Sequence, residues 1–266
     1  MGRELFAEHR GLLREIDELL PYSLEELCLE GPLEKLNSTE YTQPALFAVS
    51  AMSYLSRAHS GSRPDYLAGH SLGEYNALFA GGAFDFLTGL RIVKKRGELM
   101  SRASGGAMAA VLGLPSSTVE GLLRDLGALN VDIANYNSPL QTVISGPKDD
   151  VKSLRKGLKE AGAKFIPLKV SAAFHSRYMA EAAKEFASFL EQIDFRPLEI
   201  PVVANSTAEL YESDDIASTL AAQISSPVRW VESVRFLNTF EDAQFEEVGP
   251  GRVLTKLCAQ ILEGQC

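Results

Sequence analysis

The sequence predicts an α/β protein that carries a small inserted subdomain. Two observations lead to this prediction. A serine flanked by glycines stands between a predicted strand and a predicted helix, an order typical of α/β folds. Between residues 105 and 172, short apolar strands alternate with amphipathic helices in the order β-α-β-β-α-β. The length of 266 residues accommodates one domain with such an insertion, or two unequal domains.

The segment before the serine is predicted to be helical. Apolar residues recur at helical spacing over residues 3–20, and Pro21 ends that pattern. Ser23 is a predicted N-cap for a short helix that follows it. A strongly apolar helix is predicted over Thr42–Ala58, with Pro44 near its first turn, where a missing N–H costs little.

The pentapeptide Gly69-His70-Ser71-Leu72-Gly73 has the G-x-S-x-G form of a nucleophile elbow, a serine on a tight strand-to-helix turn. A strand over Pro64–Ala68 is predicted to enter the turn, and a helix over Glu74–Ala80 to leave it. Both glycines are expected where the turn leaves no room for a side chain. Plain tight turns also carry this pattern, but the strand–turn–helix order favours a catalytic serine.

The remaining elements follow in order after a helix over Phe86–Ser101. The inserted unit is predicted from Ala107–Leu114, Ser117–Leu126, Val131–Tyr136, Thr142–Ser145, Asp149–Ala161 and Phe165–Val170. This order is ferredoxin-like, and its hinges are expected at Gly105-Gly106 and near Ser171. Beyond it we expect a helix, a strand, a helix, a strand and a final helix: Tyr178–Ile193, Ile200–Ala204, Trp230–Asn238, Phe245–Val248 and Arg252–Ile261.

Composition narrows the class of protein. The formal net charge of −9 argues against general binding to nucleic acids and to an anionic membrane surface. Cys28, Cys258 and Cys266 are odd in number and lack the spacing of metal ligands, so we expect free thiols in a reducing compartment and no metal site. No apolar signal core follows Met1, and no apolar run approaches the ~18 residues of a membrane helix. A cytoplasmic location is therefore expected.

A catalytic serine needs a base, and the chain offers four histidines. His9 and His59 are interpreted as surface residues, and His70 as structural packing beside the serine. His175 follows the last strand of the inserted unit, where it would line a cleft between subdomains. An isolated histidine there is usually structural, but a nearby nucleophile and the poorer alternatives favour His175 as the base.

Arg96 is out of place on an apolar helix face, which it shares with Ile92, Leu99 and Met100. A buried guanidinium is costly unless it finds a partner. Two interpretations stay open, namely a structural ion pair and a bidentate clamp for a substrate carboxylate.

Seven motifs, in chain order, cover nearly the whole sequence. They are Thr42-Gln43-Pro44-Ala45-Leu46, Gly69-His70-Ser71-Leu72-Gly73-Glu74, Lys95-Arg96-Gly97-Glu98-Leu99-Met100, Asn135-Tyr136-Asn137-Ser138-Pro139, Ala172-Ala173-Phe174-His175-Ser176, Ser226-Pro227-Val228-Arg229-Trp230 and Val248-Gly249-Pro250-Gly251. Together they resemble the malonyl-CoA:acyl-carrier-protein transacylases. Within that family, the chain looks most like the free-standing, trans-acting acyltransferases of polyketide synthases.

The resemblance implies a hydrolase-like α/β large subdomain with a parallel sheet, residues 1–104 and 173–266, and a ferredoxin-like small subdomain, residues 105–172. It implies a ping-pong acyl transfer without a bound cofactor, in polyketide or fatty-acid synthesis. Ser71 would attack the thioester of malonyl-CoA with His175 as the base. The phosphopantetheine thiol of an acyl carrier protein, or of a carrier domain of a polyketide synthase, would then accept the malonyl group. A main-chain carbonyl within Ser226–Arg229 is expected to orient the histidine.

The resemblance also implies the substrate-binding residues. Arg96 would hold the free malonyl carboxylate, and Leu72 would supply one oxyanion N–H. Phe174 resembles the malonyl-selective signature and would crowd an α-methyl branch, a discrimination worth about 1–3 kcal/mol. The other residues expected to line the pocket are Gln43, Met100, Asn135 and Asn137.

One feature departs from the family. Its members begin with a strand and a Gly-Gln-Gly-Ser-Gln loop, which supplies a second oxyanion donor, ahead of the Met-Gly-Arg-Glu-Leu stretch where this sequence starts. We expect a start placed too late or an N-terminally trimmed chain. The alternatives to a transferase are a serine thioesterase or acyl hydrolase, and a catalytically impaired, acyltransferase-like binding protein. Arg96 and the absence of any histidine after His175 favour the transferase.

Overall fold

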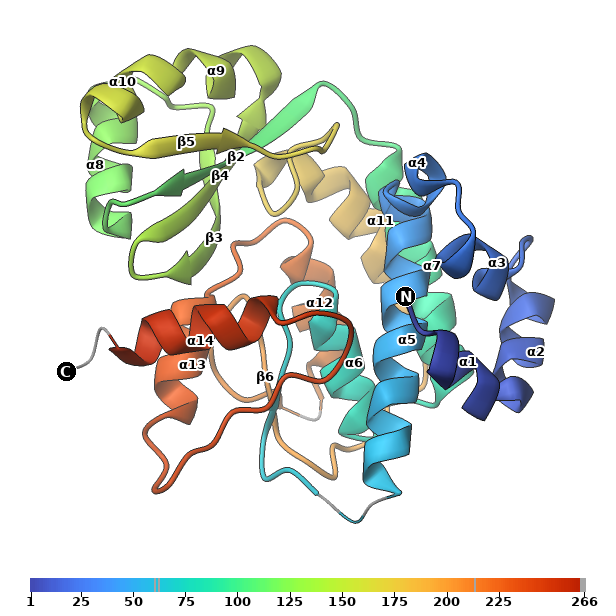
Figure 1. Ribbon diagram of the computed structural model, residues 1–266. Helices are drawn as coiled ribbons and strands as arrows, with labels where there is room; N and C mark the ends of the chain where they lie inside the picture. The colour runs from blue at the N-terminus through green and yellow to red at the C-terminus, as the bar shows by residue number, and fades with distance from the viewer. Residues whose placement is uncertain (60, 62, 213, 264–266) are drawn as a thin grey trace.

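The computed structural model describes residues 1–59, 61, 63–212 and 214–263, and it contains two separate sheets (Figure 1). The first sheet pairs β1 (Leu67–Ala68) with β6 (Val202–Val203) in parallel. The second is antiparallel, with its strands in the order β3-β4-β2-β5. The predicted α/β class, with a parallel sheet and a separate antiparallel unit, is therefore confirmed.

The chain before β1 is helical and forms α1 (Arg3–Glu8), α2 (Arg10–Leu19), α3 (Leu24–Leu29), α4 (Leu33–Leu36) and α5 (Thr39–Ala58). The single helix predicted over residues 3–20 is wrong, because the backbone of His9 leaves helical geometry and divides it. Ser23 caps α3 as predicted, and its side chain accepts a hydrogen bond from the N–H of Glu26. α4 was not predicted.

The main core lies between α5, α6 (Gly73–Ala80) and α7 (Phe86–Ser101), which Figure 1 shows side by side. α11 (Ala180–Leu190) and α12 (Ile216–Gln223) extend it. Its largest fully buried apolar side chains include Phe47, Leu78, Leu90 and Phe186. This core fixes α7, and thereby Arg96, relative to the elbow.

The antiparallel sheet consists of β2 (Gly106–Leu112), β3 (Asp132–Ser138), β4 (Gln141–Pro147) and β5 (Lys164–Pro167). α8 (Ser116–Asp125), α9 (Lys148–Ser153) and α10 (Arg155–Glu160) cover one face, where Val111 and Ile144 belong to a separate apolar cluster. Because side chains alternate along a strand, Met108 and Ala110 point to the other face, where Phe174 packs against them. The predicted helix over 149–161 is divided at Leu154.

The chain after the antiparallel unit continues through a 3-10 helix, η1 (Arg177–Met179), and ends in α13 (Trp230–Leu237) and α14 (Val253–Glu263). The strand predicted over Phe245–Val248 is wrong, because no strand pairs with it in the described part of the chain. Glu247 instead accepts hydrogen bonds from the N–H groups of Leu254 and Thr255 at the start of α14. α12 was not predicted, although Ile216 and Leu220 are spaced as on a helix.

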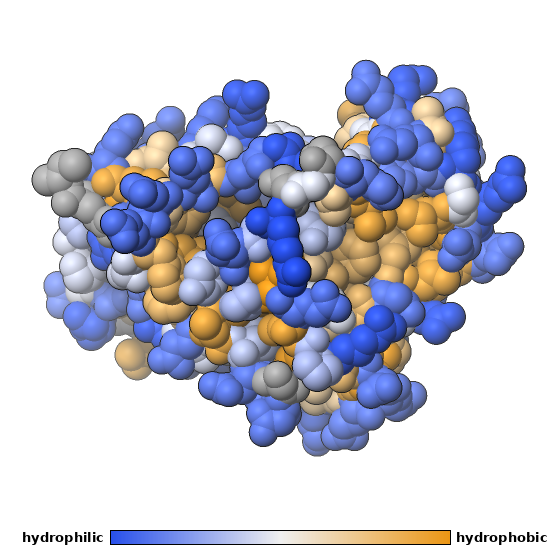
Figure 2. All heavy atoms as spheres, turned by 90° about the horizontal axis from the view of Figure 1, so that it is seen from below, coloured by the Kyte–Doolittle hydropathy of each residue, from blue (hydrophilic) through white to orange (hydrophobic). Residues whose placement is uncertain are grey.

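The surface carries most of the charge. Figure 2 shows the molecule from below, with hydrophilic side chains spread over this face and hydrophobic side chains between them. In the described ranges, no helix combines the length and apolarity needed to cross a membrane. Cys28 and Cys258 are free and buried, whereas Cys266 lies outside the described residues.

Candidate active site

The elbow connects β1 to α6, and Ser71 stands at its tip with φ at 51°, in the left-handed region. A non-glycine residue there costs on the order of 1–3 kcal/mol, so the surroundings must hold it. Asn205, two residues after β6, does so with both ends of its amide. Its Oδ1 accepts a hydrogen bond from the Ser71 N–H at 2.6 Å, and its Nδ2 donates to the Gly69 carbonyl at 2.6 Å.

The two elbow glycines differ in their need to be glycine. A Cβ at Gly69 would lie 2.0 Å from the carbonyl group of Gly73, so no side chain fits. A Cβ at Gly73 would meet nothing within 4 Å. The expectation that the turn excludes side chains therefore holds at Gly69 and is wrong at Gly73.

His175 lies against Ser71, and the distance from its Nε2 to the serine Oγ is 2.7 Å. On the other side of the ring, Nδ1 lies 3.0 Å from the Gln223 carbonyl and 3.1 Å from the Ser226 carbonyl. Carbonyls only accept, so Nδ1 carries the proton and Nε2 is free to accept the hydroxyl proton of Ser71. Ser226 lies in the stretch predicted to orient the histidine, whereas Gln223 lies before it, on α12.

Burial is the main cause of a low pKa at His175. Desolvation, then the positive charge of Arg96 and the neighbouring His70, lower the pKa of His175 from 6.5 to about 3, against the two carbonyl hydrogen bonds. The imidazole is therefore neutral at physiological pH. It can act as a base there, and the carbonyls stabilise the cation that forms transiently.

Arg96 completes the polar centre from α7 and is only 1% exposed. One terminal nitrogen donates to Gln43 Oε1 at 2.7 Å, and the other donates to Gln223 Oε1 at 3.0 Å and to Ser71 Oγ at 3.1 Å. The guanidinium also lies over the Tyr75 ring, 5.2 Å from its centroid. Within the described ranges, no carboxylate forms an ion pair with Arg96, so the structural ion pair left open by the sequence is absent there.

Three other predicted residues lie around this centre. Gln43 presents its Nε2 to the Met100 sulfur at 3.4 Å while its oxygen faces Arg96, so these three side chains meet. Leu72 follows the serine as the N-cap residue of α6, and its N–H makes no hydrogen bond within the described residues. Phe174 is partly buried between the main core and the open face of the antiparallel sheet.

The two predicted asparagines lie on β3, farther from the serine. Asn137 accepts a hydrogen bond at 2.8 Å from Nε2 of His70, which packs edge-on against Trp230. Asn135 is 6% exposed, and its backbone forms a β-bridge with Val228. Its side chain makes no hydrogen bond within the described residues. Neither side-chain amide therefore forms a hydrogen bond with Ser71 in the described residues.

The other two predictions for histidines have opposite outcomes. His59 is exposed, as expected. The surface interpretation of His9 is wrong, because its side chain is only 12% exposed and its Nε2 lies 2.9 Å from Ser56 Oγ on α5. His9 is the residue that divides α1 from α2.

Glu74 is a polar residue of the site that was not predicted. It is fully buried, and its carboxylate accepts hydrogen bonds from Tyr211 Oη and Gln223 Nε2, both at 2.5 Å, and from the Asn205 N–H at 3.1 Å. Burial raises the pKa of Glu74 to about 7, against these hydrogen bonds and Arg96. The one charged residue of α6, three residues after the serine, was the signal available in the sequence.

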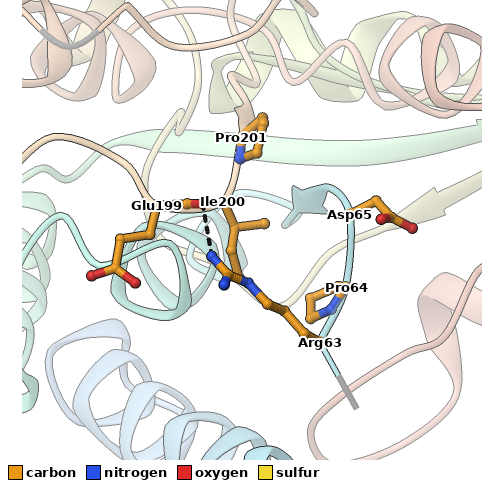
Figure 3. Close-up of a pocket in the computed structure, with 6 residues that line it drawn as sticks. All are labelled: Arg63, Pro64, Asp65, Glu199, Ile200 and Pro201. Carbon is orange, nitrogen blue, oxygen red and sulfur yellow. Dashed lines mark hydrogen bonds between the residues drawn. The ribbon is translucent and has the colours of Figure 1, made fainter. Parts of the chain in front are cut away.

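A surface pocket lies at the opposite end of the parallel pair. Figure 3 shows Arg63, Pro64, Asp65, Glu199, Ile200 and Pro201 around it, with a hydrogen bond from Arg63 to the Glu199 carbonyl. These residues precede β1 and β6, whereas Ser71 and Asn205 follow them. Ligands of parallel sheets bind at the carboxyl ends of the strands, which favours the Ser71 centre over this pocket as the candidate site.

Comparison with known families decides the class of this site. The acyl transferase domain model matches residues 1–264. The chain belongs to this family. The acyltransferase is 53% identical over 265 residues to a polyketide biosynthesis malonyl CoA-acyl carrier protein transacylase of Bacillus velezensis, an alignment that covers 98% of this chain and 91% of that protein.

Solved structures agree with the family assignment. A malonyl CoA-acyl carrier protein transacylase from Burkholderia pseudomallei superposes on the acyltransferase with a TM-score of 0.96 at 42% identity, covering 99% of this chain and 93% of that one. A malonyl-transacylase in complex with a type II PKS acyl-carrier protein gives a TM-score of 0.90 at 38% identity, covering 94% and 84%. The fold and the family predicted from the motifs are confirmed.

Proposed function

We propose that this acyltransferase moves a malonyl group from malonyl-CoA to the phosphopantetheine thiol of an acyl carrier protein, through a malonyl ester of Ser71. One observation carries the assignment of roles. The Ser71 hydroxyl lies between a neutral imidazole, 2.7 Å away, and a buried guanidinium, 3.1 Å away. A nucleophile, a base and a binding group for a carboxylate thus meet at one atom, which suits an acyl group with a free acid.

In the first half-reaction, the Ser71 oxygen attacks the thioester carbonyl while its proton passes to His175 Nε2. The Leu72 N–H makes no hydrogen bond in the described part of the chain; it lies at the start of α6, beside the nucleophile, and stabilises the oxyanion. The C–S bond then breaks, and the CoA sulfur takes the proton from the imidazolium. The two carbonyls on Nδ1 hold the ring in place throughout.

The second half-reaction repeats these steps with the carrier thiol. Its proton passes to His175, its sulfur attacks the ester carbonyl, and the Ser71 oxygen leaves and regains a proton. The malonyl carboxylate stays on Arg96 in both halves. Gln43 and Met100 fix one side of the guanidinium, which therefore keeps the same position for donor and acceptor.

The choice of acyl group follows from two side chains. Arg96 favours groups that carry a carboxylate over acetyl. Phe174, before the base, crowds an α-methyl branch and favours malonyl over methylmalonyl. The chain is further proposed to work in the cytoplasm for polyketide carrier proteins, and to divide into a large subdomain, 1–104 and 173–266, and a small one, 105–172.

Incubation with radiolabelled malonyl-CoA tests the proposal. The enzyme should retain one label, on the peptide that contains Ser71, and should lose it to an added holo carrier protein. Ser71→Ala, which preserves the fold and removes only the hydroxyl, is the matched control and should retain none. Release of free malonate without transfer would assign a hydrolase instead, and absence of both would assign a binding protein.

A further inference from the structure

Among the described residues, no acidic side chain forms an ion pair with the buried Arg96. Glu74 is instead connected to Arg96 through the side chain of Gln223. Gln223 is 1% exposed and ends α12. Its side-chain oxygen accepts from Arg96 at 3.0 Å, and its nitrogen donates to Glu74 Oε2 at 2.5 Å. A single amide therefore stands between a buried carboxylate and a buried guanidinium.

The surroundings fix which way this amide points. The Ser71 carbonyl can only accept and the Arg96 guanidinium can only donate, so the Gln223 NH₂ group faces the carbonyl, at 2.8 Å, and with it Glu74 Oε2, at 2.5 Å. The amide oxygen then necessarily faces Arg96. Glu74 itself accepts from three donors, which suits the ionised form. The Ser71 carbonyl and the Glu74 carboxylate, which is the form present above its pKa of about 7, thus set the orientation of the acceptor that Arg96 meets.

We propose that Gln223 is a positioning residue that couples Glu74 to Arg96 and so determines selectivity for acyl groups that carry a carboxylate. This inference rests on the proposed malonyl transfer. A carboxylate placed directly on Arg96 would occupy the guanidinium edge that a substrate acid needs. A neutral amide orients the same group and leaves its charge available. Glu74 keeps the amide from rotating, without itself touching Arg96.

The main chain of the same residue serves the other half of the site. The Gln223 carbonyl accepts from His175 Nδ1, and it stays in place when only the side chain is replaced. Substitution of the side chain should therefore affect the handling of the carboxylate more than the reactivity of the serine. A general structural role would instead lower the reactivity toward all acyl groups equally.

The experiment measures the rate of Ser71 acylation with malonyl-CoA and with acetyl-CoA, as a ratio, in the full-length enzyme. Gln223→Met removes both polar atoms at nearly constant volume and should lower the malonyl-to-acetyl ratio on the order of tenfold. Glu74→Gln should also lower the malonyl-to-acetyl ratio, because the amide at position 74 can no longer accept from all three donors. Gln192→Met, at an exposed position, is the matched control and should leave the ratio unchanged.

A double-mutant cycle makes the test specific to the coupling. In an Arg96→Ala background, Gln223→Met should leave the ratio unchanged, since the group it orients is gone. Equal losses with both acyl donors, or a lowered ratio that persists without Arg96, would overturn the proposal. If Gln223→Met does not fold, as judged by circular dichroism, the same cycle with Glu74→Gln decides. A parent enzyme that takes up no malonyl group would refute the proposed function itself, a distinct outcome.

Discussion

On one side of Ser71, the imidazole of His175 bonds two main-chain carbonyls, and on the other, the guanidinium of Arg96 bonds two side-chain amides. The difference matters because a carbonyl remains when its residue is replaced, whereas an amide is lost. The proposed base is therefore held by the path of the backbone, and the proposed acyl-selecting cation by replaceable side chains. We expect substitutions on the two sides to have separable effects.

The largest effect is expected at the base. His175→Ala should slow acylation of Ser71 by about 10²- to 10⁴-fold, because the hydroxyl loses its proton acceptor. The loss should be similar for malonyl-CoA and acetyl-CoA, since the imidazole contacts the reacting atom and not the acyl tail. Rapid-quench measurement of the acyl-enzyme with both donors checks this. A loss confined to malonyl-CoA would contradict the separation of the two sides.

The next effect is expected on the cation side and should depend on the substrate. Arg96→Ala should reduce malonyl loading on the order of 10²-fold, since loss of a buried charge partner costs about 2–5 kcal/mol. Acetyl loading should fall far less, so relative preference shifts toward acetyl. Competition between the two donors, analysed by mass spectrometry of the Ser71 peptide, measures the shift. An unchanged preference would refute the clamp.

A smaller effect is expected at Phe174, the residue before His175. Phe174→Ala should open space for an α-methyl branch and raise methylmalonyl relative to malonyl loading on the order of tenfold. Phe189→Ala, on α11, removes an equal ring that is partly buried against the same core and should leave the preference unchanged. Loading assays with both CoA esters compare the variants. Equal shifts in both variants would mean that loosened packing, and not the ring beside His175, changes the preference.

The smallest effect is expected from pH, because His175 should stay unprotonated and the reactivity of Ser71 should therefore not change. Because the pKa of His175 is lowered to about 3, the imidazole stays neutral on acidification to pH 5. Inactivation of Ser71 by phenylmethylsulfonyl fluoride, an uncharged reagent, should therefore not slow between pH 8 and pH 5 through protonation of His175. In Arg96→Ala the pKa of His175 should move up toward 6.5, because the positive charge that helps to lower it is removed. A titration near 6.5 that persists in Glu74→Gln, where the buried carboxyl with a pKa of about 7 is absent, would contradict the buried, neutral base.

The sequence predicted the parts of the molecule that depend on local patterns. The boundaries of α7, and the order of strands and helices along the chain from β2 to β5, followed from periodicity and turn residues. Ser71, His175 and Arg96 stood out by residue type. Glu74, Asn205 and Gln223 did not stand out, because the role of a buried polar residue depends on its hydrogen-bond partners on other elements. The helix that ends at Gln223 was itself overlooked, and with it one of the carbonyls on His175.

The failed strand at Phe245–Val248 has a related cause. A short extended run such as Phe-Glu-Glu-Val becomes a strand only when another strand offers its N–H and C=O groups. Local pattern cannot report that neighbour, and within the described residues none pairs with this run. The same limit applies to Gly73, where the motif suggested crowding that the tertiary structure does not contain.

The pairing of Val228 with β3 has a mechanical consequence. The Tyr136 N–H donates to the Val228 carbonyl at 2.9 Å, and the Val228 N–H donates to the Ala134 carbonyl at 2.9 Å. Two residues earlier, the Ser226 carbonyl bonds the base. The antiparallel sheet and the imidazole are thus attached to one short segment. A load that pulls β3 away must either break both hydrogen bonds or drag this segment with it, which would tilt the ring away from the serine.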